Sequence, residues 1–328
     1  MLGRSGRHFA RFCAGLVAAT VVSAGAEGAD ILIGADEDRP AAIQAARTLC
    51  RALDQSKDPR LPAGACAVTT TAGPLASLEG VSGGALDIAL VPSDWLHHAL
   101  NRSGPLSFVD IPFDGLRTLF LLNVEPLTIV ARRAAGIAGL DDLVGQRIDI
   151  GAPGTRARVL MDAVVAAAGL SRGDFPLVEE LPEAERSLAL CHARIDATVF
   201  HGGHPDPRIT DVVSRCDAVP VPVAGLAVTR LLAERPYLHP TAIPAGTYPG
   251  QDRPVAGFGP RMVAVVSQDL DNDWAAAVTA TVIGALDMLK TAHPVFRGLD
   301  PAGMSRNGLT APLHEGARQV FLEEAGSR

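Results

Sequence analysis

Residues 147–170, RIDIGAPGTRARVLMDAVVAAAGL, place glycines, a threonine and an arginine between a strand pattern and a helix pattern. Pro153 and Gly154 predict a tight turn, and Thr155 stands where a helix N-cap is expected. The free N–H groups and the positive dipole end of such a helix favour an anion. Because neither GxxxxGK[ST] nor GxGxxG occurs here, we do not expect a nucleotide phosphate. An ordinary turn between a strand and a helix explains the same glycines.

Polar or charged residues stand in further turns, each placed after an apolar run that predicts a strand. Open α/β sheets bind their ligands at the carboxyl ends of strands, so turns of this kind can converge on one small molecule. We therefore expect a ligand site built from several turns. Its candidate residues are Asp36, Asp38, Ala72, Gly73, Ser93, Asp94, Trp95, Pro153, Gly154, Thr155, Arg156, Phe200 and His201.

The charged and aromatic candidates each have a ligand-binding role and a structural alternative. Arg156 suits a bidentate pair with a ligand carboxylate, and an arginine in solvent or paired with an aspartate is the alternative. Asp36 and Asp38 suit an amino group or a cation, while Asp38 also suits a helix cap. The Ser-Asp-Trp run at 93–95 suits ligand binding, but serine and aspartate also cap helices, and the tryptophan also suits the core.

The run HGGHPD at 201–206 contains two histidines and an aspartate, which are zinc or iron ligands by type. The chain offers no second cluster to complete such a site. His97 and His98 are adjacent on a predicted helix and point in different directions, so they do not form a metal pair. We expect neither a metal nor another cofactor.

Four cysteines follow the first 26 residues, at positions 50, 66, 191 and 216. An even number in an exported protein predicts two disulfides, with three pairings open. The clustering favours Cys50–Cys66 and Cys191–Cys216, each closing a loop of about 15 to 25 residues that contributes about 3 kcal/mol. Paired cysteines are not nucleophiles, and no nucleophile–base set is apparent, so we expect a protein that is not an enzyme.

The first 26 residues have the pattern of a secretory signal peptide. Three arginines precede an apolar core at 12–22 that is too short to span a bilayer, and AGA at 24–26 is a cleavage site. We expect export to the periplasm after removal of residues 1–26. Removal leaves 26 basic against 36 acidic residues, a net charge of −10, which argues against nucleic acid and anionic lipid as partners.

Strand and helix patterns alternate along the remaining chain, and about 300 residues suggest two lobes. Two strands in direct succession, at 116–122 and 127–131, break the alternation and predict a crossing between lobes; the strand at 261–267 is the candidate return. Residues 234–260 predict a loop segment with short elements, and 274–290 and 316–324 predict two helices. The expected lobes are 27–123 with 258–328, and 124–257, joined by a strand hinge.

The segments LDIALVPSDWLHHALNRSGP, LFLLNVEPLTIVARR, GLDDLVGQRIDIGAPG, CHARIDATVFHGGHP and GLTAPLHEGA occur in one order. Together they resemble the TAXI solute receptors of TRAP transporters, which are periplasmic type II binding proteins. The resemblance covers almost the whole chain after the leader. It implies a two-lobed α/β fold that captures a small organic acid or amino acid, and a membrane permease driven by an ion gradient as partner.

The sequence departs from the family at the ligand turns. The first turn reads ADEDRP at 35–40 where the family carries a glycine-rich run, and Arg156 stands where the family often has glycine. We expect a monomer that binds a small carboxylate-containing ligand for transport. A sensory module for a membrane receptor kinase would use the same pocket and is the alternative, and an exported enzyme on the same fold is the third reading.

Overall fold

The computed structural model describes residues 31–61, 66–293, 296–306 and 308–326, so the expected signal peptide lies outside the described residues. Its strands are β1 Ile31–Asp36, β2 Cys66–Thr71, β3 Ile88–Pro92, β4 Leu116–Val124, β5 Leu127–Arg132, β6 Arg147–Asp149, β7 Leu177–Glu179, β8 Ala197–His201, β9 Ala218–Val221, β10 Leu238–Ile243 and β11 Val255–Ser267. Its helices are α1 Pro40–Asp54, α2 Pro74–Ser82, α3 Ser93–Asn101, α4 Arg156–Ala167, α5 Glu183–Cys191, α6 Pro207–Arg215, α7 Leu226–Glu234, α8 Asn272–Gly284, α9 Leu286–Ala292, α10 Pro301–Ser305 and α11 Glu315–Gly326.

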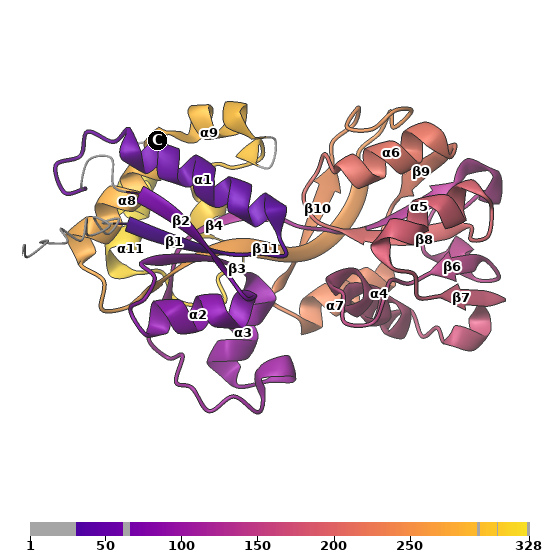
Figure 1. Ribbon diagram of the computed structural model, residues 1–328, viewed down its shortest axis with the longest axis horizontal. Coiled ribbons are helices and arrows are strands. Elements are labelled where there is room, and N and C mark those ends of the chain that lie inside the picture. Colours follow the sequence, from indigo (N-terminus) through magenta and orange to yellow (C-terminus); the bar gives the residue numbers. More distant parts are fainter. Residues whose placement is uncertain (1–30, 62–65, 294–295, 307, 327–328) are drawn as a thin grey trace, which may run out of the picture.

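The first lobe is a sheet in the order β2-β1-β3-β11, with β4 on the same part of β11. Strands β1, β2 and β3 are parallel, and β11 runs antiparallel to β3 and β4. Helices α1, α8 and α11 cover one face and α2 and α3 the other (Figure 1). With helices on both faces, β3 is buried at every residue, as its continuous apolar run IALVP predicts.

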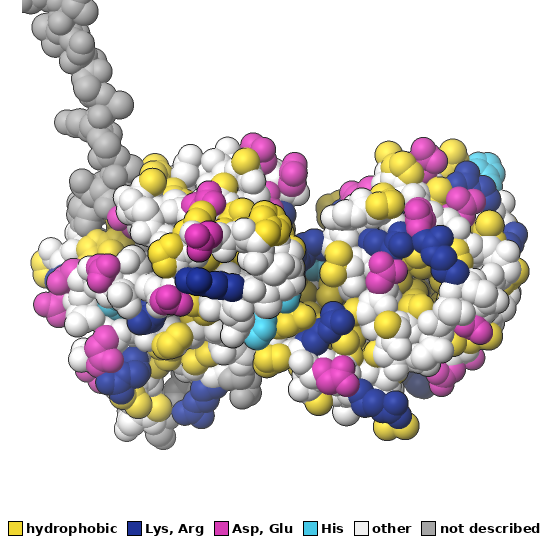
Figure 2. Space-filling model, turned by 90° about the horizontal axis from the view of Figure 1, so that it is seen from below, with side chains coloured by type: hydrophobic (Ala, Val, Ile, Leu, Met, Phe, Trp, Pro, Cys, Tyr) yellow, Lys and Arg dark blue, Asp and Glu magenta, His cyan; other side chains and the backbone are white. Residues whose placement is uncertain are grey.

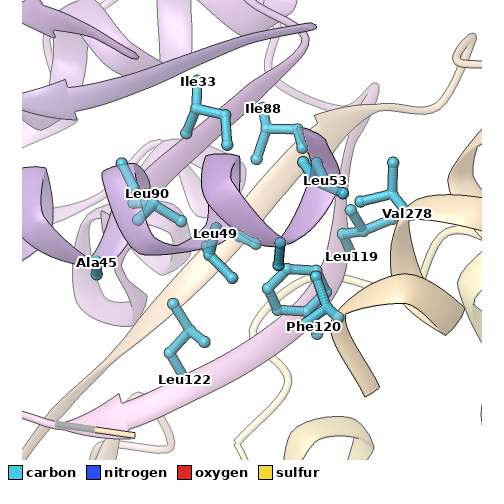
Figure 3. Packing of buried hydrophobic residues seen from close by; sticks show 14 of the residues in the cluster. Ile33, Ala45, Leu49, Leu53, Ile88, Leu90, Leu119, Phe120, Leu122 and Val278 are labelled. Carbon is cyan, nitrogen blue, oxygen red and sulfur yellow. The ribbon is translucent and has the colours of Figure 1, made fainter. Parts of the chain in front are cut away.

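The core of this lobe lies between α1 and the sheet (Figure 3). Leu49 of α1 packs among Ile33, Ile88 and Phe120 of the strands, and Val278 of α8 joins the same cluster. All five side chains are at most 1% exposed. The alanines of α1 bring the helix close to the sheet, which is how a chain poor in aromatic residues fills its interior.

The second lobe is built on β5, which pairs antiparallel with β8 and with β9, while β6 pairs parallel with β7 and β8. Strand β10 pairs with the first half of β11. Helices α4 and α7 pack on one face and α5 and α6 on the other. Each lobe therefore has its own three-layer core, and the mixed α/β architecture expected from the sequence is confirmed.

Two segments connect the lobes. Strand β4 passes through Glu125 and Pro126 into β5, and the thirteen residues of β11 pair with strands of both lobes. The backbones meet where Gly259 lies against Glu125, because a Cβ at position 259 would stand 2.0 Å from the Glu125 carbonyl oxygen. Only glycine allows this approach of two strands.

Two expected elements differ in detail. Residues 234–260 were expected as a loop segment with short elements, and they contain the six-residue strand β10 and the start of the long strand β11, because strand pairing overrides the many prolines and glycines. The expected helix at 274–290 is broken into α8 and α9, which meet at 60°.

Among the described residues, no single helix is long and apolar enough to cross a membrane. The bent pair α8 and α9 together has the length and the apolar composition of a membrane span, and nothing else marks it as one.

The two disulfides join the cysteines as the clustering favoured. Cys50 of α1 is bonded to Cys66 of β2 with 5.2 Å between Cα atoms, and Cys191 of α5 to Cys216 after α6 with 4.5 Å. Both distances lie in the range of native disulfides. Each bond stays within one lobe, so the disulfides do not restrict movement between the lobes.

Candidate functional site

Charged side chains gather where the carboxyl ends of the strands face each other across the two lobes. Asp36 ends β1, Asp94 lies in the first turn of α3, and Arg156 begins α4 in the other lobe. On the space-filling surface a groove separates the lobes on the side of α3 and α7 (Figure 2). We call the following residues the interlobe cluster: Asp36, Arg39, Asp94, Glu125, Arg156 and His201.

An ion pair in this cluster bridges the lobes. Nη2 of Arg156 donates to Oδ2 of Asp94, and the two side chains are 24% and 14% exposed. Nε of Arg156 is buried and has no hydrogen-bond partner among the described residues. Arg156 is therefore paired with an aspartate, which is the structural alternative considered from the sequence. Its Nε–H, without a partner among the described residues, can still donate to a further group.

A second pair involves Arg39 and Glu125, with side chains 13% and 3% exposed. Arg39 is the residue before α1, and Glu125 lies in the connection between β4 and β5. Burial, and then the charge of Arg156, lowers the pKa of Arg39 to about 10. Nη1 of Arg39 is also buried without an acceptor among the described residues. The positive charges of Arg39 and Arg156, which belong to opposite lobes, thus repel each other.

His201 ends β8 beside Leu127 of the connection between the lobes. Burial lowers its pKa well below 6.5, and the charges of Arg156 and Arg39 lower it further. The imidazole is therefore neutral at pH 7 and offers one N–H and one acceptor nitrogen. Its Nε2 is buried and unpartnered among the described residues.

Together these groups provide a site whose hydrogen-bond donors are incompletely satisfied. Buried polar atoms without partners are rare, and each carries a free-energy cost that a bound acceptor removes. Nε of Arg156, Nη1 of Arg39 and Nε2 of His201 all fall in the interlobe cluster. The N–H groups of the first turn of α4 add donors beside them. Such an arrangement suits an oxyanion, which accepts several hydrogen bonds at once.

The turn that carries Arg156 is held by a buried polar network. Oδ1 of Asp149 accepts from the N–H groups of Gly151 and Leu181 at 3.0 and 2.9 Å. Its Oδ2 accepts from Oγ1 of Thr198 at 2.6 Å and lies 3.3 Å from Nε of Arg186. Both charged side chains are at most 2% exposed. Because Asp149 ties the end of β6 to two neighbouring segments, it fixes where α4 begins.

Thr155 is the N-cap of α4, as predicted, with Oγ1 accepting from the N–H of Arg158 at 3.3 Å. The same hydroxyl donates to the carbonyl of Ala152 at 2.8 Å. The donor that we expected to reach a ligand is therefore used within the turn. Pro153 and Gly154 are exposed at its tip.

Ser93 and Asp38 do not have the capping roles considered for them. Pro92 is the N-cap of α3, and the fully buried Oγ of Ser93 donates to the Tyr237 carbonyl and accepts from the N–H of Arg261, at 2.8 and 2.9 Å. Arg39 occupies the N-cap position of α1, and its side chain forms no capping hydrogen bond. Asp38 is exposed, and its backbone N–H donates to Oδ1 of Asp36 at 3.0 Å. Helix α1 therefore begins one residue later than a cap at Asp38 would place it, and α3 begins one residue earlier than a cap at Ser93 would place it.

The remaining candidates lie away from the cluster or in the core. Phe200 is 1% exposed and packs in the second lobe, with the guanidinium of Arg208 6.0 Å from its ring centroid. Trp95 is half-buried against the core of the first lobe. Ala72 is exposed and Gly73 half-buried in the turn before α2, where no described contact joins them to Arg156.

Sequence reasoning missed Arg39, Glu125 and Tyr237. His97 and His98 of α3 lie 4.8 and 5.2 Å from the Tyr237 ring, so α3 also contacts the segment before β10 in the other lobe. The signal for Arg39 was available in the DEDRP run, where the only base among acids precedes a helix. Glu125 gave a weaker signal, as the one charge in the break between two apolar strands.

His204 and Asp206 of the histidine-rich run have structural roles. Nε2 of His204 lies 2.9 Å from Oγ1 of Thr128, and its Nδ1 lies 2.5 Å from Oη of Tyr248. Asp206 is the N-cap of α6. Among the residues that the structure describes, no group of three histidines, cysteines or carboxylates is placed to hold a metal.

Stability is expected to fall as the pH drops from 6.5 towards 4. Burial lowers the pKa of His204 and of His239 to about 4, and that of His201 well below 6.5, so the unfolded chain binds protons in this range before the folded chain does. Above pH 7 these groups are neutral in both states and the effect vanishes. Urea unfolding at several pH values measures it. His204→Gln should reduce the slope and exposed His192→Gln should not; equal slopes in all three proteins would contradict the assignment.

A cavity of about 510 Å³ lies on another side of the connection between the lobes. Asn123, Val124 and Pro126 form one wall, and residues of both lobes form the others. None of the ligand-binding residues predicted from the sequence lines it. The interlobe cluster itself is closed by the ion pairs described above.

The two α/β lobes joined by strands are the fold of two-lobed solute-binding proteins. The chain belongs to the NMT1-like family, whose model matches residues 46–326. A TctC solute-binding protein from Polaromonas, without ligand, is 16% identical, with a TM-score of 0.52 over 90% of this chain and 95% of that one.

Two further structures are similar to the chain. An alkanesulfonate-binding protein SsuA from Xanthomonas axonopodis pv. citri, bound to MOPS, is 17% identical, with a TM-score of 0.43 over 90% of this chain and 84% of that one. The periplasmic aliphatic sulphonate-binding protein SsuA from Escherichia coli is 12% identical, with a TM-score of 0.45 over 89% and 82%.

Proposed function

We propose that this chain is a periplasmic solute receptor of the TAXI kind, which captures a small carboxylate-containing molecule and delivers it to a TRAP-type membrane permease. One observation carries the proposal: Arg39 and Arg156, from opposite lobes, keep buried N–H groups beside His201 that have no partner in the described part of the chain. The order of the sequence motifs supports the TAXI kind. A signal peptide at 1–26 would bring the chain to the periplasm, where it acts as a monomer.

The ligand carboxylate takes the position that Asp94 now occupies on Arg156. Its oxygens accept from the guanidinium, from the first N–H groups of α4 and from His201. Because Arg156 belongs to one lobe and Arg39 to the other, an anion between them adds a contact to each lobe. The closed form is stabilised by that shared contact, which is how ligand binding is linked to lobe closure.

The proposed lobes are 27–123 with 258–328, and 124–257. The close approach of Gly259 and Glu125 lies at this boundary, where the backbone changes lobe. Of the predicted site residues, we propose that Asp36, Asp94, Arg156 and His201 face the ligand. The turns at 72–73 and 153–155 shape the rim.

The test identifies the ligand before any variant is made. The chain from residue 27 onwards is purified from periplasm, its bound solute is identified by native mass spectrometry, and affinity is measured by calorimetry on protein refolded without solute. A carboxylate that binds well, while its methyl ester does not, supports the proposal. Solution scattering should give a smaller radius of gyration with the acid than without it. A bound solute that lacks an anionic group would overturn the proposal.

A further inference from the structure

The cavity beside the lobe connection has features of a second ligand site. Its volume of about 510 Å³ is in the range of small-molecule sites. Its walls come from three places: the connection at 123–126, the segment 241–247 with β10 in the second lobe, and Arg297–Leu299 after α9 in the first lobe. Val124 and Pro126 line the cavity, whereas Glu125 between them pairs with Arg39, so the connection separates this cavity from the interlobe cluster.

The charge of the cavity has one sign. Arg261 and Arg297 line it, and no aspartate or glutamate does. Arg261 already has protein partners: its Nε donates to the carbonyl of Leu122 at 2.9 Å, and the negative charge of Asp300 interacts favourably with its guanidinium. Arg297 is exposed and forms no salt bridge with any residue that the structure describes, so it is the main cation available to a ligand.

The cavity also contains an acceptor and an apolar wall. Oδ1 of Asn123 is buried and has no hydrogen-bond partner within the described ranges. A buried acceptor of this kind is satisfied by an N–H or O–H of a bound molecule. Val124, Pro126 and Leu299 also line the cavity and provide apolar surface.

We propose that this cavity binds a compact organic anion that also carries a hydroxyl or amino donor. Arg297 pairs with the anionic group, Asn123 accepts from the donor, and the apolar wall covers the body of the molecule. Since both lobes and the connection form the walls, occupancy of this site is coupled to the angle between the lobes. The site acts on the receptor as a regulatory site, separate in place from the ligand site in the interlobe cluster.

The probe for this site is 4-hydroxybenzenesulfonate, an anion with an apolar ring and a hydroxyl donor, and 4-hydroxybenzenesulfonamide is its neutral counterpart. Binding is measured by calorimetry on the intact chain. We expect the sulfonate to bind and the sulfonamide to bind at least tenfold more weakly. Arg297→Glu should weaken sulfonate binding tenfold or more, and Ala245→Phe should reduce it by filling the cavity.

Two further variants locate the probe. Arg230→Glu reverses an exposed arginine of α7 that does not line the cavity, and Arg156→Ala removes the arginine of the interlobe cluster. Arg230→Glu should bind the sulfonate as the natural protein does, and Arg156→Ala, which breaks the ion pair between the lobes, should still bind it. The proposal is overturned if the probe does not bind at millimolar concentration or if Arg297→Glu binds it normally. It is equally overturned if Arg156→Ala alone abolishes binding, because the probe then lies in the interlobe cluster.

Discussion

Replacing Asp149 by alanine is expected to lower the free energy of unfolding by about 3–5 kcal/mol. The substitution leaves the Arg186 guanidinium buried without its carboxylate and removes the acceptor of two backbone N–H groups. Urea unfolding followed by circular dichroism measures the loss. Asp162→Ala is the matched control, because this exposed aspartate pairs with Arg158 four residues away on α4 and should contribute about 0.3–0.5 kcal/mol.

Asp149→Asn is a second test of the buried network if the alanine variant does not fold. The amide keeps one acceptor oxygen, so this variant should retain part of the network and lose less stability than the alanine variant. Because the network holds the turn before α4, ligand affinity should fall along with stability in both variants. A loss below 1 kcal/mol in Asp149→Ala, similar to that of Asp162→Ala, would show that the buried pair does not hold the turn.

Removing the charge of Arg156 and removing the charge of its partner Asp94 are expected to change ligand affinity in opposite directions. Arg156→Ala removes a charge-assisted hydrogen bond worth about 1.5–3 kcal/mol, so affinity for the proposed carboxylate should fall about 10- to 100-fold. Asp94→Asn removes the carboxylate that competes for the same guanidinium, so affinity should rise, by about tenfold. Calorimetry with the ligand recovered from the natural protein measures both.

Arg230→Ala, on the exposed side of α7, is the control for the loss of an arginine and should bind the ligand normally. If Arg156→Ala is silent while the methyl ester of the ligand fails to bind, the backbone N–H groups of α4 hold the anion without the side chain. If Asp94→Asn binds more weakly than the natural protein, Asp94 contacts the ligand directly and does not compete with it.

Local patterns predicted the elements whose causes are local. The apolar run of β3, the N-cap at Thr155 and the two disulfides follow from residue types within a few positions of one another or from cysteine spacing. The expected long helix at 274–290 is wrong because the chain bends by 60° between α8 and α9, and both pieces pack on α1. Apolar periodicity alone does not contain that bend.

The chemistry of the site was predicted in part. Arg156 and Asp94 were both candidates, but their pairing joins residues 62 positions apart in different lobes, which no local pattern reveals. Arg39 and Glu125 were missed for the same reason, since their roles appear only when the connection between the lobes is placed beside α1. Phe200 was expected at the site because it ends a strand, and its ring belongs to the face that packs inward.

The path of β11 determines when the first lobe can be finished during synthesis. Strands β3 and β4 both pair with β11, so the centre of the amino-terminal sheet is supplied by residues 255–267. Helices α8 and α11, which complete the same core, come later still. A growing chain therefore cannot close this lobe until the whole second lobe has been made. The half of the protein that is translated first is the half that folds last, which keeps the nascent chain open until synthesis is nearly complete.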